Sequence, residues 1–110
     1  MFSPEEMPFI DEREQALHPN LTEMTLFTLE KLLEKDTKNA GFFMMSEGGR
    51  IDQAHHKNYA KRALEELREL DETIEATFKF LKQKGILDET LILLTADHSH
   101  QFVMGSYTAF

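Results

Sequence analysis

The chain has 110 residues, of which 41% are hydrophobic and 29% charged, and its 12 Lys and Arg against 20 Asp and Glu give a formal net charge of −8. This length suits one small domain or a piece of a larger one, with the composition of a soluble globular chain. Without cysteine it has no disulfides, thiolate zinc site or cysteine nucleophile, and its acidity argues against nucleic acid as a partner. The sequence shows neither a membrane span nor a targeting signal.

The first 20 residues contain all three prolines and are interpreted as an irregular lead-in. From Asn20 onward the apolar residues recur at helical spacing. Asn20 and Glu23 have the spacing of a capping box, which predicts a helix over residues 21–35. Asn20-Leu21-Thr22 also matches a glycosylation sequon, but the helix cap is the favoured interpretation because a capping side chain turns toward the backbone.

Two short apolar runs, 41–46 and 90–95, are bounded by turn residues. Such runs are typical of strands that are buried on both faces, as in parallel sheets. Between them the pattern predicts one long helix over residues 52–84, with Gly85 at its C-terminal end. Its apolar stripe comprises Ala60, Ala63, Leu64, Leu67, Leu70, Ile74, Phe78 and Leu81, and its opposite, solvated face comprises Lys61, Arg62, Glu65, Glu66, Glu69 and Glu72.

Two buried strands joined by an amphipathic helix form a right-handed βαβ unit. The predicted fold class is therefore α/β, with a mainly parallel sheet. Ligands of such sheets bind beyond the carboxyl ends of the strands. The polar residues that follow both predicted strands are expected to meet at this edge.

The first polar cluster runs from Glu47 to His56. Asp52 and His56 are four residues apart, so they share one face of a helix and can bind the same ion. His55 is rotated by about 100° from His56 and is not expected to join them. Glu47 lies across a Gly-Gly bend that allows close approach to a ligand. Arg50 is interpreted as an ion-pair partner of its acidic neighbours, with substrate phosphate as the alternative.

The second cluster is Asp97-His98-Ser99-His100, directly after the second predicted strand. Together the two clusters hold four of the five histidines. Imidazole and carboxylate groups are good zinc ligands, and a hard carboxylate such as Glu47 also suits magnesium. The alternative is that these residues cap helices and satisfy the backbone of loops. Metal binding is the favoured hypothesis.

Residues 41–56, Gly-Phe-Phe-Met-Met-Ser-Glu-Gly-Gly-Arg-Ile-Asp-Gln-Ala-His-His, resemble a metal-binding segment of animal-type alkaline phosphatases. Residues 95–100, Thr-Ala-Asp-His-Ser-His, resemble the second metal-binding signature of this family. The resemblance implies a three-layer αβα fold. Residues 21–110 would then be a βαβ-containing, metal-binding part of its catalytic domain, and that domain would be incomplete.

The resemblance also implies a role for each matched residue. The family binds two zinc ions and one magnesium ion. Carried over by position, Glu47 is a magnesium ligand, Asp52 and His56 are ligands of the first zinc, Asp97 and His98 are ligands of the second zinc, and His100 is a second-shell histidine that hydrogen-bonds a zinc carboxylate.

By the same resemblance, the whole protein hydrolyses phosphate monoesters through a phosphoserine intermediate. The family's nucleophilic serine has no match here, so the 110 residues alone are expected to be inactive. The resemblance further implies a homodimer located outside the cell or at its surface, with a GPI anchor as one form of attachment. Two alternatives stay open: another phosphotransferase or phosphomutase of the same superfamily, and a non-catalytic α/β binding module.

Overall fold

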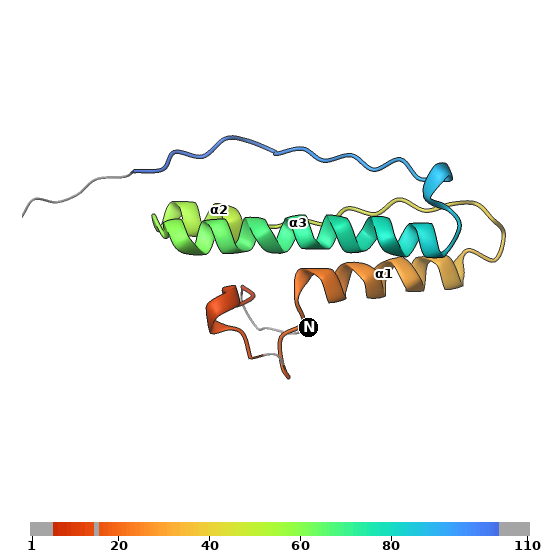
Figure 1. The fold of residues 1–110 in the computed structure, drawn as a ribbon, viewed down its shortest axis with the longest axis horizontal. Helices are drawn as coiled ribbons and strands as arrows, with labels where there is room; N and C mark the ends of the chain where they lie inside the picture. Colours follow the sequence, from red (N-terminus) through yellow and green to blue (C-terminus); the bar gives the residue numbers. More distant parts are fainter. Residues whose placement is uncertain (1–5, 15, 104–110) are drawn as a thin grey trace, which may run out of the picture.

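The computed structural model describes residues 6–14 and 16–103. The remainder of the predicted lead-in and the last seven residues of the predicted metal-binding segment, 104–110, lie outside the described residues. Three helices, α1 (Leu21–Lys35), α2 (Arg50–His56) and α3 (Ala60–Gln83), are accompanied by two short 3-10 turns, η1 (Ile10–Glu12) and η2 (Leu87–Glu89). Helix α1 lies lengthwise along α3, and α2 packs against the beginning of α3 (Figure 1).

Helix α1 has the bounds and the cap that the sequence predicts. Asn20 Oδ1 accepts a hydrogen bond from the Glu23 N–H at 2.7 Å, and Glu23 Oε2 accepts one from the Asn20 N–H at 2.8 Å. This reciprocal pair satisfies two backbone donors that a helix start leaves open. The hydroxyl groups of Thr22 and Thr73, 2.8 Å apart, then join α1 to α3.

The prediction of one long helix over residues 52–84 is wrong, because the structure has two helices with a break after His56. Asn58 lies in the break with a φ of 54°, in the left-handed region that asparagine tolerates better than most residues. The chain therefore turns between α2 and α3. The end of α3 agrees with the sequence, since Gly85 follows it with a φ of 73°.

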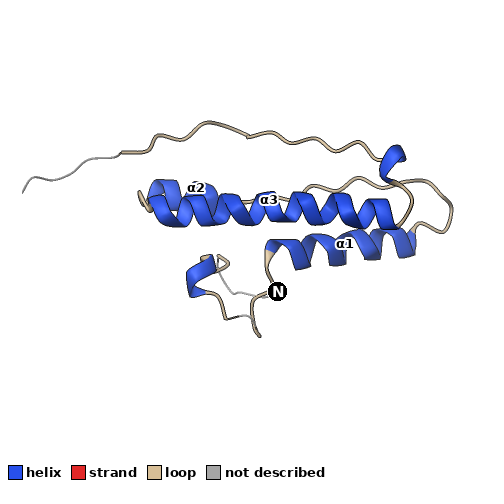
Figure 2. Cartoon of the chain, in the orientation of Figure 1, coloured by secondary structure: helices blue, strands red, loops and turns tan. Residues whose placement is uncertain are grey.

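The predicted α/β fold with a parallel sheet is also wrong, because the described residues contain helices and no strand (Figure 2). Segments 41–46 and 90–95 both run as irregular chain. Their apolar side chains are not buried, with Phe43 90% exposed and Leu91 82% exposed. An apolar run favours a strand only when a neighbouring strand takes up its backbone hydrogen bonds, and neither segment has such a neighbour in the described part of the chain.

The expectation of a solvated acidic face on α3 is wrong for two of its glutamates. Glu66 is only 4% exposed and Glu69 only 8%, whereas Leu64 of the predicted apolar stripe is 68% exposed. The lead-in covers the glutamates: the Ile10 N–H donates to Glu66 Oε1 at 2.9 Å, and Arg13 donates to both carboxylate oxygens of Glu69.

Phe9 anchors the lead-in on the helices. It is 1% exposed and forms a small core with Ala54 of α2 and Ala63 of α3. This core fixes where α2 lies on α3, and α2 carries part of the candidate site. Among the helices of the described residues, none is long and apolar enough to cross a membrane.

Candidate metal centre

Asp52 lies in the first turn of α2, and His56 follows one turn later on the same face. His56 Nε2 is 3.4 Å from Asp52 Oδ2, as their spacing of four residues predicts. Helix α2 is held in place through Ala54, which is completely buried in the core with Phe9. The packing of α2 therefore presents the two side chains together.

The segment that follows residue 96 brings two more histidines to Asp52. His98 Nε2 is 3.8 Å and His100 Nε2 is 3.7 Å from Asp52 Oδ1. The ring of His100 also meets the ring of His56 edge-on, with their centres 4.4 Å apart. The two clusters that the sequence predicts to converge do converge on Asp52, although no sheet edge brings them there.

Contacts of His100 and of the residues that follow it hold this segment in place. The Val103 N–H donates a hydrogen bond to Asn58 Oδ1 at 3.1 Å, in the break between α2 and α3. The ring of His55 lies 5.4 Å from the ring of His100 and 5.8 Å from the ring of Phe102. His55 thus contacts the segment through its ring, and its position differs from that of His56 as the sequence predicts.

The geometry around Asp52 fits a divalent cation. Asp52, His56 and His100 each offer one ligand atom, and these atoms all lie within 4.8 Å of one another. Two ligands that sit about 2.0–2.1 Å from a tetrahedral zinc ion are about 3.3 Å apart. The separations of 3.4 Å from His56 Nε2 to Asp52 Oδ2 and of 3.7 Å from His100 Nε2 to Asp52 Oδ1 are close to this value, each imidazole being taken with its nearer carboxylate oxygen. Asp52 Oδ1 is buried and has no hydrogen-bond partner among the described residues, which leaves it available to an ion.

Backbone carbonyl groups orient the two later imidazoles. His98 Nδ1 lies 3.0 Å from the Ser99 carbonyl oxygen, and His100 Nδ1 lies 2.6 Å from the Gln101 carbonyl oxygen. Since a carbonyl only accepts, Nδ1 is the donor in each ring, and in the neutral imidazole Nε2 then keeps a free lone pair. This is the tautomer that a metal ligand needs at Nε2. The Ser99 carbonyl, followed by the negative charge of Asp97, raises the pKa of His98.

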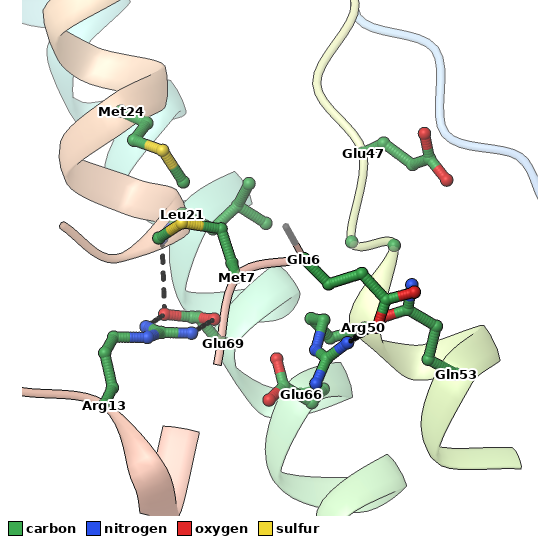
Figure 3. Close-up of a pocket in the computed structure, with 12 residues that line it drawn as sticks. Glu6, Met7, Arg13, Leu21, Met24, Glu47, Arg50, Gln53, Glu66 and Glu69 are labelled. Atoms are coloured by element: carbon green, nitrogen blue, oxygen red, sulfur yellow. Dashed lines mark hydrogen bonds and ion pairs between the residues drawn. The ribbon is translucent and has the colours of Figure 1, made fainter. Parts of the chain in front are cut away.

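The remaining predicted ligands lie at the margin of this group. Asp97 Oδ2 is 3.2 Å from His98 Nε2, but its side chain is 82% exposed. The structure does not bring Glu47 to Asp52 by any hydrogen bond or ion pair between described residues. Glu47 borders a neighbouring cavity, where its carboxylate points away from Arg13 and Glu69 (Figure 3).

That cavity, of about 230 Å³, lies between the lead-in, α3 and the start of α2 (Figure 3). Arg50 forms an ion pair there, as predicted, but its partner is Glu6 at 2.7 Å rather than Glu47 or Asp52. Its guanidinium also stacks 3.8 Å above the ring of Phe9. Burial raises the pKa of Glu66 on the cavity wall, and the hydrogen bonds that Arg13 donates to Glu69 raise the pKa of Arg13.

The resemblance implies that His100 contacts a zinc carboxylate, and His100 Nε2 lies 3.7 Å from Asp52 Oδ1. Sequence reasoning overlooked Asn58, although an asparagine within a long helical pattern is a signal for a helix end.

Comparison with known proteins points to one family. The family model described as alkaline phosphatase matches residues 1–110. The chain is 43% identical over 108 residues to the tissue-nonspecific isozyme of alkaline phosphatase from Rattus norvegicus, covering 98% of this chain and 19% of that protein. It is 47% identical over 93 residues to alkaline phosphatase 4 of Drosophila melanogaster, covering 84% of this chain and 15% of that protein.

A third relative is the membrane-bound alkaline phosphatase of Bombyx mori, 38% identical over 97 residues that make up 88% of this chain and 16% of that protein. The chain therefore spans about a fifth or less of the length of the curated relatives that it matches. No solved structure gives a significant match.

Proposed function

This chain belongs to the alkaline phosphatase family, and we propose that it is the metal-binding segment of a phosphomonoesterase that depends on zinc and magnesium. The observation that carries the proposal is the group formed by Asp52, His56 and His100, whose ligand atoms converge from two distant parts of the chain. A group for helix capping would not need two imidazoles beside one buried carboxylate oxygen that has no hydrogen-bond partner among the described residues.

The protein's own residues prepare this site for a cation. Asp52 supplies the negative charge, and His56 and His100 supply imidazole nitrogens beside its carboxylate. The carbonyl of Gln101 fixes the tautomer of His100 before any ion arrives. A divalent ion bound here supplies positive charge that polarises a phosphoryl oxygen and balances charge on the phosphate ester.

We further propose the finer assignment that the family resemblance suggests. Asp52 and His56 bind the first of two zinc ions, Asp97 and His98 bind the second, and Glu47 binds magnesium. We assign His100, whose Nε2 lies 3.7 Å from Asp52 Oδ1, to the first zinc as a third ligand. The short distance between His98 and Asp97, 3.2 Å, supports their pairing on one ion.

The reaction we propose for the whole protein is hydrolysis of phosphate monoesters through a phosphoserine whose serine lies outside this chain. We also propose that the whole protein is a homodimer at the cell surface. A relative described as membrane-bound supports this location.

The test uses the full-length protein that carries this chain. Asp52→Ala and His56→Ala should each lower the zinc content and the release of phosphate from a chromogenic ester, with both measured on the same preparations. His18→Ala is the matched control, because His18 lies in the lead-in, away from Asp52. Full activity and full zinc content in Asp52→Ala would overturn the proposal.

A further inference from the structure

We propose that Asn20 carries an N-linked glycan while its side chain continues to cap α1. The residues Asn20-Leu21-Thr22 form a complete acceptor sequon, with a residue other than proline in the middle. A cap and a glycan look like competing uses of one side chain. The structure shows that they use different atoms of it.

The cap uses only one side of the Asn20 amide. Oδ1 accepts the hydrogen bond from the Glu23 N–H at 2.7 Å, and the second bond of the capping box involves the Asn20 backbone N–H and Glu23 Oε2. Nδ2, the atom that a glycan would modify, has no hydrogen-bond partner among the described residues. It is also not one of their buried, unpaired polar atoms, so it retains contact with solvent.

The surroundings of Asn20 leave room for a glycan. Asn20 borders an open, polar hollow between the lead-in and α3, whose outer wall includes Arg68 and Glu72. The side chains of Arg68 and Glu72 are 69% and 62% exposed. A sugar is polar and needs such a wet surface rather than an apolar one.

The chemistry requires a single bond exchange. Asn20 Nδ2 forms a bond to C1 of an oligosaccharide, the bond between C1 and the oxygen of its lipid diphosphate carrier breaks, and the diphosphate leaves with the electron pair. Nδ2 loses one of its two protons, and the amide oxygen Oδ1 is unchanged. Because a secondary amide still accepts through Oδ1, the hydrogen bond from the Glu23 N–H can form afterwards.

In the folded chain the Thr22 hydroxyl is hydrogen-bonded to Thr73, so transfer must precede the docking of α1 on α3. The chain must also enter the secretory pathway to meet the carrier, which agrees with the cell-surface location proposed above. The proposal does not depend on metal binding, so it can fail or succeed separately from the phosphatase assignment.

The experiment expresses the full chain behind a cleavable secretion signal in an animal cell line. Peptide mapping after treatment with peptide N-glycosidase should show Asn20 converted to aspartate, together with the loss of glycan mass from the intact chain. Thr22→Ser should keep the glycan and Thr22→Val should abolish it, because only the former retains the hydroxyl. An unmodified Asn20 in the secreted chain would overturn the proposal.

A second measurement tests the coexistence of cap and glycan. Enzymatic deglycosylation leaves aspartate at position 20, which caps through its own oxygens. The glycosylated chain should therefore melt at the same temperature as the deglycosylated chain, and Asn20→Ala should melt lower than both. If the glycosylated chain melted as low as Asn20→Ala, the glycan would displace the cap and this part of the proposal would be wrong.

Discussion

Asn58 and Val103 are 45 residues apart in sequence, yet Asn58 Oδ1 accepts the Val103 N–H at 3.1 Å. This bond ties the break between α2 and α3 to the segment that carries His98 and His100. It thereby holds two imidazoles beside Asp52, on the first turn of α2. Asn58 contacts no candidate ligand through this bond, so we regard it as a positioning residue.

Asn58→Gly should weaken zinc binding by the chain about fivefold, which corresponds to the loss of about 1 kcal/mol for one hydrogen bond. Glycine adopts the φ of 54° as readily as asparagine, so the variant removes the acceptor without straining the break. Competition with a chromophoric zinc chelator measures the affinity. Asn58→Asp, which keeps an acceptor oxygen, should bind like the original chain, and equal affinity in Asn58→Gly would show that the bond does not position the segment.

Zinc should stabilise the folded chain, because the ligands converge only when residues 97–103 dock on α2. Binding to the folded state alone adds about 2.7 kcal/mol when the free ion is at about 100 times its dissociation constant. Thermal unfolding followed by circular dichroism should show a rise in midpoint with zinc and its reversal with a chelator. Asp52→Asn, of the same size but without charge, should lose most of this rise. If zinc raised the unfolding midpoint equally in the original chain and in Asp52→Asn, the ion would bind at another site.

Arg13→Met should destabilise the chain by about 3 kcal/mol, because it leaves the buried carboxylate of Glu69 without its charged partner. Urea unfolding measures the free energy. Lys31→Met is the matched control, since Lys31 pairs with Glu34 on the exposed surface of α1 and should change the free energy of unfolding far less than Arg13→Met does. If the two substitutions lowered the free energy of unfolding by similar amounts, Arg13 would not be what holds the lead-in on α3.

Glu66→Gln should make the dependence of stability on pH less steep. Burial raises the pKa of Glu66, so the folded chain holds this proton more tightly than the unfolded chain does. The stability that protonated Glu66 contributes to the folded chain is therefore fully present below the usual glutamate pKa of 4.5. It is lost as the pH rises through the raised pKa of Glu66 in the folded chain.

Unfolding in urea at several pH values should consequently show that Glu66→Gln gains stability relative to the original chain between acid and neutral pH. The glutamine keeps an oxygen that accepts from the Ile10 N–H, so the comparison isolates the charge. Glu75→Gln serves as the control, because the Glu75 side chain is 67% exposed. A constant difference between Glu66→Gln and the original chain would contradict the role of burial.

The local parts of the structure could be predicted from the sequence. The capping box at Asn20 and the helix after it depend on residues three apart, and the shared face of Asp52 and His56 depends on one helical turn. These features are set by neighbours in the chain. The convergence of the two polar clusters was also predicted, but from the edge of a sheet that the described residues do not contain.

Features that depend on residues far apart in the sequence could not be predicted from local sequence patterns. The run at 90–95 has the composition of a buried strand, but composition does not supply the neighbouring strand that pairing requires. Glu69 fits a solvated helix face until Arg13, 56 residues earlier, folds over it. The role of Asn58 likewise depends on Val103, for which no local pattern exists.

The central claim is that His100 and His56 bind a cation together with Asp52, and cobalt(II) titration of the chain tests it most directly. Cobalt(II) reports tetrahedral coordination through its visible absorption, and His100→Ala should reduce both this signal and the affinity. His18→Ala is the matched control, because His18 lies in the lead-in, away from Asp52. We expect His18→Ala to keep the signal. An unchanged cobalt spectrum and affinity in His100→Ala would contradict the proposed metal centre.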